Sequence, residues 1–493
     1  MNISTALRAG VRMLSERSAS VLPVYLLTTG LFGIARIPIM LAGLAALALI
    51  SIDGRLGDLL TTLKDIDLST IDSQSPPPEV TKAMESLISP EIVLLLLGGV
   101  LISLILAFVA SVLARATVLN AIVGLLRDED GVRAAIVGTR ENWLSFLGVR
   151  FLLFGALAVV TVPIGILGLG LIAVAGAVGV VGMVLGGLFS LLLVLIVLAL
   201  FAFAEQAIVV DDVGTAGAIR QSVKFPFRRP GAFVGYIAVA LGVGVIGTVV
   251  LTAASFSEAP RVTALVGLVL LRPVLDGFKT ALYAERDLSA HETPSLGNRG
   301  WQAFGGGLRA LGAFVRDHPL ANAASAVIFG AGIVGGWATT APYGPSLPVQ
   351  GEISNVFGSL PVGTFVNLAV NNWLVAVDTA YSGVAVGVPS VVNLVFNGVL
   401  IGALGGVFDP TAFTALVAPH GIIEVPALVL GGGLGLWLGG VGYRTARGQT
   451  DADGLAAALR RTYRVLLGLV TLFVVAAFIE AFLTPAIASV IVG

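Results

Sequence analysis

Long apolar runs separated by short polar segments dominate the pattern of the chain. A helix that crosses the hydrocarbon core of a bilayer needs about 20 mostly apolar residues, and this criterion predicts about eleven spans here. The predicted spans are residues 21–50, 92–113, 148–168, 178–203, 232–253, 262–282, 320–340, 366–388, 391–407, 421–441 and 463–483. The apolar stretch at 148–203 is too long for one crossing, and its glycine-rich part at 168–176 predicts a turn. The pattern therefore predicts an all-α polytopic membrane protein.

Arginine and lysine gather in alternate loops between these spans. They occur before the first span and in the loops after the second, fourth, sixth and tenth spans. The opposite loops, among them residues 53–91 and 341–365, carry few basic residues. Because basic loops stay in the cytoplasm, we expect a multi-pass protein of the cell membrane with a cytoplasmic N-terminus and an external C-terminus.

A polar connector at residues 285–318 separates the sixth span from the seventh. It predicts a six-span membrane domain in residues 1–300 and a five-span domain in residues 301–493, that is, a six-helix and a five-helix bundle. Within the first part, residues 131–139 resemble residues 214–222, and each segment follows acidic residues. Each segment predicts a short helix at the membrane surface, either an ordinary interfacial helix or one copy of a duplicated pair.

Composition agrees with the hydropathy pattern. Apolar residues make up 57% of the chain and charged residues 12%, about half the charged share of a soluble domain. This excludes a soluble globular enzyme and a disordered chain. The net charge of −1 gives no basic surface for nucleic acid, and the absence of cysteine excludes disulfides and thiolate chemistry. The lipid bilayer is the expected surrounding.

The sixth span contains charged side chains within its apolar sequence. Arg272 and Asp276 stand four residues apart, so they can pair on one helical face. Charges inside a membrane are costly and commonly functional. The pattern predicts an intramembrane ion pair, with a structural role or a role in transport.

Polar side chains recur in four spans of the second half. With the predicted orientation they fall at similar depth, in the outer half of the membrane. An unpaired carboxylate or amide in hydrocarbon costs several kcal/mol, so these groups are expected to meet in a polar pocket. The six residues are Asn371, Asn372, Asn397, His420, Glu424 and Glu480.

Three interpretations of this pocket are open. The first is a hydrogen-bonded network that ties the helices together. The second is a divalent metal site formed by His420, Glu424 and Glu480, because imidazole and carboxylate groups are common metal ligands. The third is a proton or ion relay, or a substrate pocket open to the outside. His420 and Glu424 share a helical face, although the second histidine of a His-Glu-x-x-His motif is missing.

Glycines follow this motif in the tenth span, at Gly431–Gly433, Gly435 and Gly439-Gly440. Small residues at this density allow helices to approach closely. They predict tight packing of the tenth span and make a homo-oligomer a reasonable expectation.

The motifs of the last five spans together resemble the stage II sporulation protein M family. The resemblance covers roughly residues 315–493, and its most specific piece is the Pro-His-Gly-x-x-Glu sequence. The matching pieces are Asn371-Asn372, Phe396-Asn397-Gly398 with Gly402, the sequence Pro-His-Gly-Ile-Ile-Glu-Val-Pro at 419–426 with its trailing glycines, and Ile-Glu-Ala-Phe at 479–482.

The resemblance implies a membrane component of a bacterial or archaeal cell envelope. The family's namesake is a scaffold that holds two cell-wall-degrading partners while a forespore is engulfed. Members also occur in organisms that neither sporulate nor build peptidoglycan, so a sporulation role is not carried over. The resemblance implies a membrane-embedded core that organises envelope partners or forms a pocket or pore.

The functional prediction is a non-enzymatic scaffold or channel-like component of an envelope assembly, with envelope or membrane proteins as partners. One alternative is a metal-dependent intramembrane hydrolase that uses His420, Glu424 and Glu480. The other is a small-solute or ion transporter whose path uses the same pocket with Arg272 and Asp276.

Overall fold

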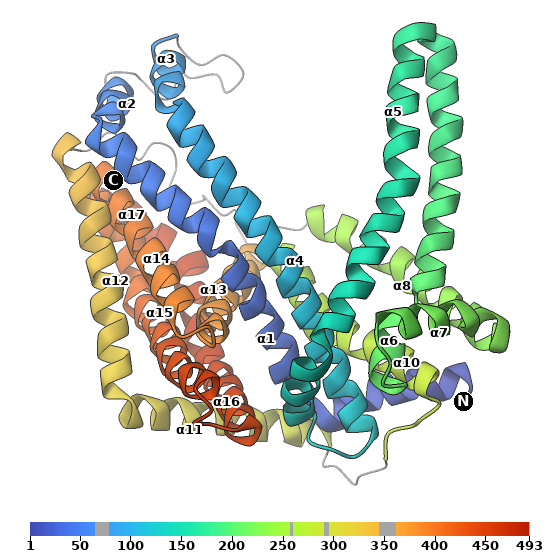
Figure 1. Cartoon of the computed structure of the whole chain (residues 1–493). Helices are drawn as coiled ribbons and strands as arrows, with labels where there is room; N and C mark the ends of the chain where they lie inside the picture. The colour runs from blue at the N-terminus through green and yellow to red at the C-terminus, as the bar shows by residue number, and fades with distance from the viewer. Residues whose placement is uncertain (65–77, 257–259, 290–294, 345–360, 493) are drawn as a thin grey trace. The chain divides into compact units, whose positions relative to one another are not determined.

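The structure is a computed structural model that describes residues 1–492 except 65–77, 257–259, 290–294 and 345–360. Helices form the regular structure of these described residues, and none of them lies in a strand ladder (Figure 1). Eight helical segments in this part of the chain are long and apolar enough to cross a membrane. The predicted all-α polytopic class is thus confirmed.

The eight membrane-length segments do not coincide one by one with the predicted spans. The segment Gly131–Val210 contains both the third and the fourth predicted span. The sixth and eighth predicted spans fall on helices, but these helices are not among the eight. The number of crossings stays a prediction.

Helix follows helix along the described parts of the chain (Figure 1). The α-helices are α1 (Ile3–Ile52), α2 (Arg55–Lys64), α3 (Pro78–Leu87), α4 (Pro90–Leu126), α5 (Gly131–Phe201), α6 (Ala204–Val210), α7 (Thr215–Arg228), α8 (Pro230–Phe256), α9 (Pro260–Val266), α10 (Arg272–Ala284), α11 (Leu296–Asp317), α12 (Pro319–Thr340), α13 (Val362–Ser382), α14 (Val388–Val407), α15 (Pro410–Ala446), α16 (Ala452–Phe478) and α17 (Thr484–Val492). The described residues also form two π-helical turns, η2 (Gly267–Leu271) and η5 (Ile479–Leu483), and a 3₁₀ turn, η3 (Ala341–Tyr343).

The chain divides into two compact units, and single helices pass from one to the other. Unit 1 consists of Met1–Val24, Ser111–Thr248 and Leu270–Glu292. Unit 2 consists of Tyr25–Ala110, Val249–Val269 and Thr293–Gly493. Residues 25–110 of the N-terminal sequence therefore belong to the same compact unit as the C-terminal helices. Helices α1 and α4 each contribute residues to both units. The membrane-domain boundary near residue 300 stays a prediction.

In unit 1 the longest helix is interrupted once. The backbone of α5 leaves the helical region at Gly176, where φ is 52° and ψ is −123°. A positive φ is accessible to glycine at little cost, and the two limbs of α5 run side by side on either side of this residue (Figure 1). The turn predicted within the glycine-rich stretch is confirmed. Large apolar side chains along both limbs are exposed, such as Phe154 and Phe189, as expected for a surface in contact with lipid tails.

In unit 2, α12 and α14 touch through glycines. A methyl group added at Gly336 of α12 would lie 2.1 Å from the carbonyl oxygen of Val399, and one at Gly402 of α14 would lie 1.9 Å from that of Ile333. Only glycine permits backbones this close, as in Gly-x-x-x-Gly helix pairs. The glycine stretch of α15 packs in the same way, since a methyl group at Gly435 would lie 2.5 Å from the carbonyl oxygen of Thr379 on α13.

Candidate functional site

Three of the predicted polar residues converge in unit 2. His420 and Glu424 stand one turn apart on α15, and Glu480 lies on η5, the π-helical turn between α16 and α17. One possible ligand atom from each residue lies within 4.8 Å of the other two. All three side chains are half-buried. We call His420, Glu424 and Glu480 the His-Glu-Glu cluster.

Local sequence explains how α15 presents its two residues. Asp409 caps the start of the helix by accepting a hydrogen bond from the Ala412 amide at 2.9 Å, and Pro410 occupies the first turn. Pro419 and Pro426 flank the His420–Glu424 segment inside the helix. Proline has no N–H, so it interrupts the regular hydrogen bonding of the turns on either side of the cluster.

The third residue comes from an irregular turn. Glu480 is part of η5, Ile479–Leu483, in which the helix widens to π geometry. Single π turns within α-helices are frequent at functional sites, because they redirect the side chains they carry. The residue after η5 also reaches the cluster, since the Thr484 hydroxyl lies 3.5 Å from Nδ1 of His420. This contact helps to orient the imidazole ring.

The two carboxylates are incompletely satisfied by hydrogen bonds. The side chain of Asn372 on α13 lies near Glu424. Oε2 of Glu424 and Oε2 of Glu480 are buried and have no hydrogen-bond partner within the described ranges. Two negative charges this close repel each other strongly in a medium of low dielectric constant. The arrangement therefore calls for a proton or a cation between the carboxylates.

The predicted asparagines do not all lie in the same place. Nδ2 of Asn371 donates to Oδ1 of Asn372 at 3.1 Å, so this pair adjoins Glu424. Nδ2 of Asn397 instead donates to the carbonyl oxygen of Asn393, on its own helix α14, at 2.8 Å. Participation of Asn397 in the pocket stays a prediction.

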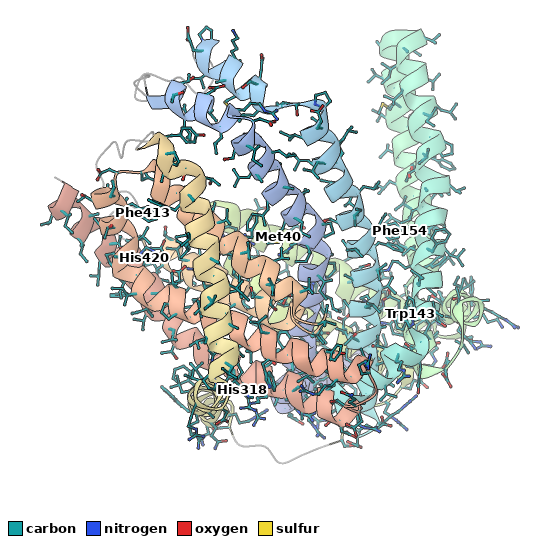
Figure 2. All side chains as sticks on the ribbon, turned by 60° about the vertical axis from the view of Figure 1, so that its left-hand side comes forward. Met40, Trp143, Phe154, His318, Phe413 and His420 are labelled. Carbon is teal, nitrogen blue, oxygen red and sulfur yellow. The ribbon has the colours of Figure 1, made fainter. Side chains whose placement is uncertain are left out.

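The His-Glu-Glu cluster has the composition of a candidate metal centre. One imidazole and two carboxylates can hold Zn²⁺ or a similar divalent ion, and three protein ligands leave a coordination position for water or another ligand. The other histidine of unit 2, His318, stands at the start of α12, at a different level of the unit from His420 (Figure 2). It contacts the rings of Phe314 and Trp437 instead.

An apolar groove of about 640 Å³ lies beside the cluster. Its walls come from α15 and α17, and two of its residues, Pro419 and Ile422, flank His420 in sequence. The lining residues are Pro410, Thr411, Thr414, Ala415, Ala418, Pro419, Ile422, Ile487 and Ile491.

An ion pair joins two further charged residues of unit 2. Nη1 of Arg36 on α1 lies 3.6 Å from Oδ2 of Asp378 on α13. The approach depends on Gly33, because a methyl group there would lie 2.1 Å from Oδ1 of Asp378.

Unit 1 contains a charged network that the sequence did not reveal. Arg115 on α4 bonds to Glu205 and to Asp276, at 2.8 Å in each case, and Arg150 on α5 bonds to Glu205 at 2.7 Å. The sequence pattern places Arg115 in a loop, although α4 continues to Leu126. An observable signal was Glu205, which interrupts an apolar run. The predicted pairing of Arg272 with Asp276 stays a prediction, and Arg115 is a partner that Asp276 has in the structure.

Comparisons with known proteins agree with the resemblance found in the sequence. Residues 325–485 match the stage II sporulation protein M family, and this segment includes all six residues of the predicted polar pocket. An uncharacterized protein of Methanocaldococcus jannaschii is 29% identical over 146 residues, which are 28% of this chain and 80% of that protein. No solved structure matches the chain. The protein is thus a multi-pass membrane protein whose residues 325–485 are similar to the stage II sporulation protein M family.

Proposed function

We propose that this protein is an integral membrane scaffold of a cell-envelope assembly and that its C-terminal helices bind one divalent cation. The ligands are His420, Glu424 and Glu480. The observation that carries the proposal is the convergence of one ligand atom from each residue to within 4.8 Å.

The two carboxylates of the cluster favour a bound cation. Each has an oxygen that is buried without a hydrogen-bond partner among the described residues. Burying unpaired charge is expensive, and a divalent cation offsets both negative charges at once. The cation also links α15 to η5, so that binding stabilises the packing of the C-terminal helices.

The role in an assembly is inferred from the family match to residues 325–485. In this proposal the cation fixes the shape of the C-terminal bundle, and other envelope proteins dock on the bundle. The partners are membrane proteins or a second copy of the chain. A channel-like variant of the proposal uses the same cation site within a conducting path.

Metal-linked stability tests the cation site. The protein is stripped with EDTA, and its melting is followed by circular dichroism in detergent with and without added Zn²⁺ or Mn²⁺. A ligand present at 100 times its Kd stabilises the folded state by about 2.7 kcal/mol. We expect wild type to gain stability, and Glu480→Gln to gain little, because the substitution removes a charged ligand and keeps the shape of the side chain.

The matched control is His318→Gln, which alters a histidine outside the cluster. It should respond to metal as wild type does. An equal metal response in wild type and Glu480→Gln would contradict the proposed ligand set. Failure of metal to stabilise any of the three proteins would contradict the cation site itself.

A second candidate function is a metal-dependent hydrolase, and the apolar groove beside the cluster favours it. A groove of about 640 Å³ between α15 and α17 has room for part of a lipid-like substrate. A cation at the cluster would supply an activated water, and Glu424 would be a ligand or the general base. The test is hydrolysis of a fluorogenic long-chain ester in mixed micelles. Turnover that requires metal and disappears in Glu424→Gln would support this candidate, and its absence in metal-loaded wild type would argue against it.

A further inference from the structure

The helix α7 lies next to membrane-length segments at both ends. Four residues separate the segment Gly131–Val210 from α7, and one residue, Arg229, separates α7 from the segment Pro230–Val250. Because α7 (Thr215–Arg228) connects two membrane-length segments through such short links, it has to lie near a membrane surface. This position fits the interfacial helix that the sequence predicts at residues 214–222.

One face of α7 carries a stripe of positive charge. Arg220, Lys224 and Arg228 follow one another at intervals of four residues, so they share a face. None of the three pairs with a carboxylate in the ranges that the structure describes. The nearby charge of Arg220, together with burial and Arg228, lowers the pKa of Lys224. Such a stripe destabilises an isolated helix and becomes favourable beside a surface of negative charge.

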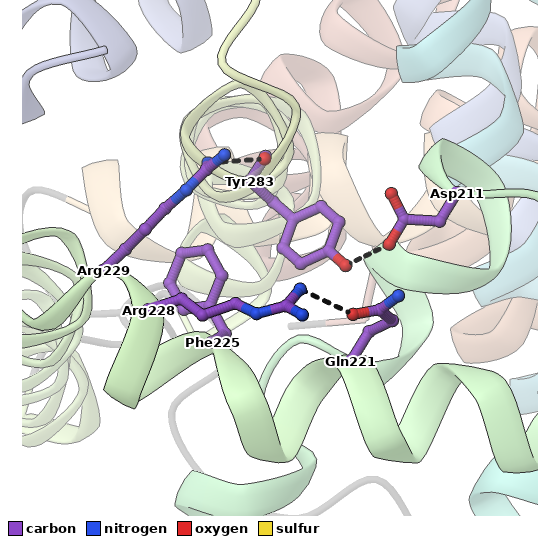
Figure 3. A pocket seen from close by; sticks show the side chains of 6 residues that line it. All are labelled: Asp211, Gln221, Phe225, Arg228, Arg229 and Tyr283. Atoms are coloured by element: carbon purple, nitrogen blue, oxygen red, sulfur yellow. Dashed lines mark hydrogen bonds between the residues drawn. The ribbon is translucent and has the colours of Figure 1, made fainter.

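A cavity of about 160 Å³ opens at the C-terminal end of this stripe (Figure 3). The cavity has room for several water molecules and therefore for a group of the size of a phosphate. The lining residues are Asp211, Gln221, Phe225, Arg228, Arg229 and Tyr283.

Most polar groups of this cavity already have partners. The charge of Arg228 is the one in this cavity that no carboxylate of the described residues neutralises. The Tyr283 hydroxyl donates to Asp211, and Arg229 pairs with Glu285 at 2.9 Å. Arg228 donates to the amide oxygen of Gln221 at 3.2 Å, which holds the guanidinium at the cavity without neutralising it (Figure 3). A guanidinium presents several N–H donors in one plane and binds phosphate oxygens well.

We infer that α7 and this cavity bind the headgroup of an anionic phospholipid, with its phosphate at Arg228. Arg220 and Lys224 then face the neighbouring negative headgroups. The ring of Phe227, the residue before Arg228, is 81% exposed and enters the apolar part of the same leaflet. The inference is independent of the proposed cation site, which lies in the other unit.

The test is binding of short-chain lipids to the detergent-purified full chain, measured by native mass spectrometry. Dioctanoyl phosphatidylglycerol is the anionic probe, dioctanoyl phosphatidylcholine the neutral probe, and inorganic phosphate the free anion. We expect phosphatidylglycerol to bind in preference to phosphatidylcholine. Arg228→Gln should weaken phosphatidylglycerol about fivefold, as expected for one basic residue at an anionic surface. Lys224→Gln is a second variant that should also weaken the binding of phosphatidylglycerol.

The matched control is Arg309→Gln, which removes the same charge from an exposed position on α11. It should bind phosphatidylglycerol as wild type does. Equal weakening by Arg228→Gln and Arg309→Gln would overturn the assignment to this cavity. Equal binding of both lipids would overturn recognition of headgroup charge. If inorganic phosphate displaced phosphatidylglycerol at an equal concentration, the ligand would be a free phosphate, and the assignment of a lipid headgroup would be overturned.

Discussion

Two adjacent glycines of α12 predict opposite effects of the same substitution. At Gly336 a new methyl group would lie 2.1 Å from the carbonyl oxygen of Val399 and 2.8 Å from the amide nitrogen of Ala403, both on α14. At Gly335 nothing lies within 4 Å of the new methyl group. The two positions share a helix and a sequence neighbourhood, so each is a control for the other.

The magnitudes follow from these distances. A carbon approaches a carbonyl oxygen to about 3.3 Å, so Gly336→Ala must move α12 from α14 by about 1.2 Å. Overpacking in a close-packed interior costs about 1–3 kcal/mol, and the upper end applies here because both opposing atoms are backbone. Gly335→Ala gains about 0.5–1 kcal/mol of helix stability. The two variants should therefore differ by about 4 kcal/mol in the free energy of unfolding.

The assay is unfolding by SDS in mixed micelles, followed by far-ultraviolet circular dichroism on wild type and both variants. We expect Gly336→Ala to unfold at lower SDS than wild type, and Gly335→Ala at equal or higher SDS. Gly402→Ala should behave as Gly336→Ala does, because its methyl group would lie 1.9 Å from the carbonyl oxygen of Ile333. Equal stability of the Gly335 and Gly336 variants would refute the glycine-mediated contact between α12 and α14.

Three further predictions concern other parts of the chain. Arg115→Gln should destabilise the protein by about 3 kcal/mol in the same SDS assay, because it breaks a largely buried ion-pair network, whereas the exposed Arg8→Gln should change little. Burial and the charge of Arg461 lower the pKa of His318, so the folded state favours the neutral ring, and stability present above about pH 6.5 should fall as pH decreases. The melting temperature should therefore drop less between pH 8 and pH 5 in His318→Gln than in wild type; an equal drop would argue against this role. Because the chain has no cysteine, Gln449→Cys should react with an impermeant maleimide only from the cytoplasmic side and Met84→Cys only from outside, and the reverse labelling would contradict the predicted orientation.

The sequence predicted those features that depend on local spacing. His420 and Glu424 share a face of α15 because they stand four residues apart. The turn in α5 followed from glycines in an apolar run that is too long for one crossing, and the break falls at Gly176. Periodicity and composition decide such features, and both can be read from the chain.

Other features depend on packing between distant segments. Helix α15 begins at Pro410, eleven residues before the predicted span. It continues through Pro419, because a proline inside a membrane helix does not have to end the helix. The role of Arg115 was missed because α4 extends beyond the predicted span and carries this residue to Glu205. Asn397 has the right residue type in a predicted pocket, yet the hydrogen bond it donates is to its own helix. Tertiary contacts decide these positions.

The central claim is that His420, Glu424 and Glu480 hold one divalent cation. The most direct measurement is the metal content of the purified protein, stripped with EDTA, reloaded with Zn²⁺ or Mn²⁺ and desalted, for wild type, His420→Ala and His318→Ala. We predict about one ion per chain in wild type and in His318→Ala, and much less in His420→Ala. Only the His420→Ala substitution removes a ligand of the cluster. Equal metal content in all three proteins, or none in wild type, would contradict the claim.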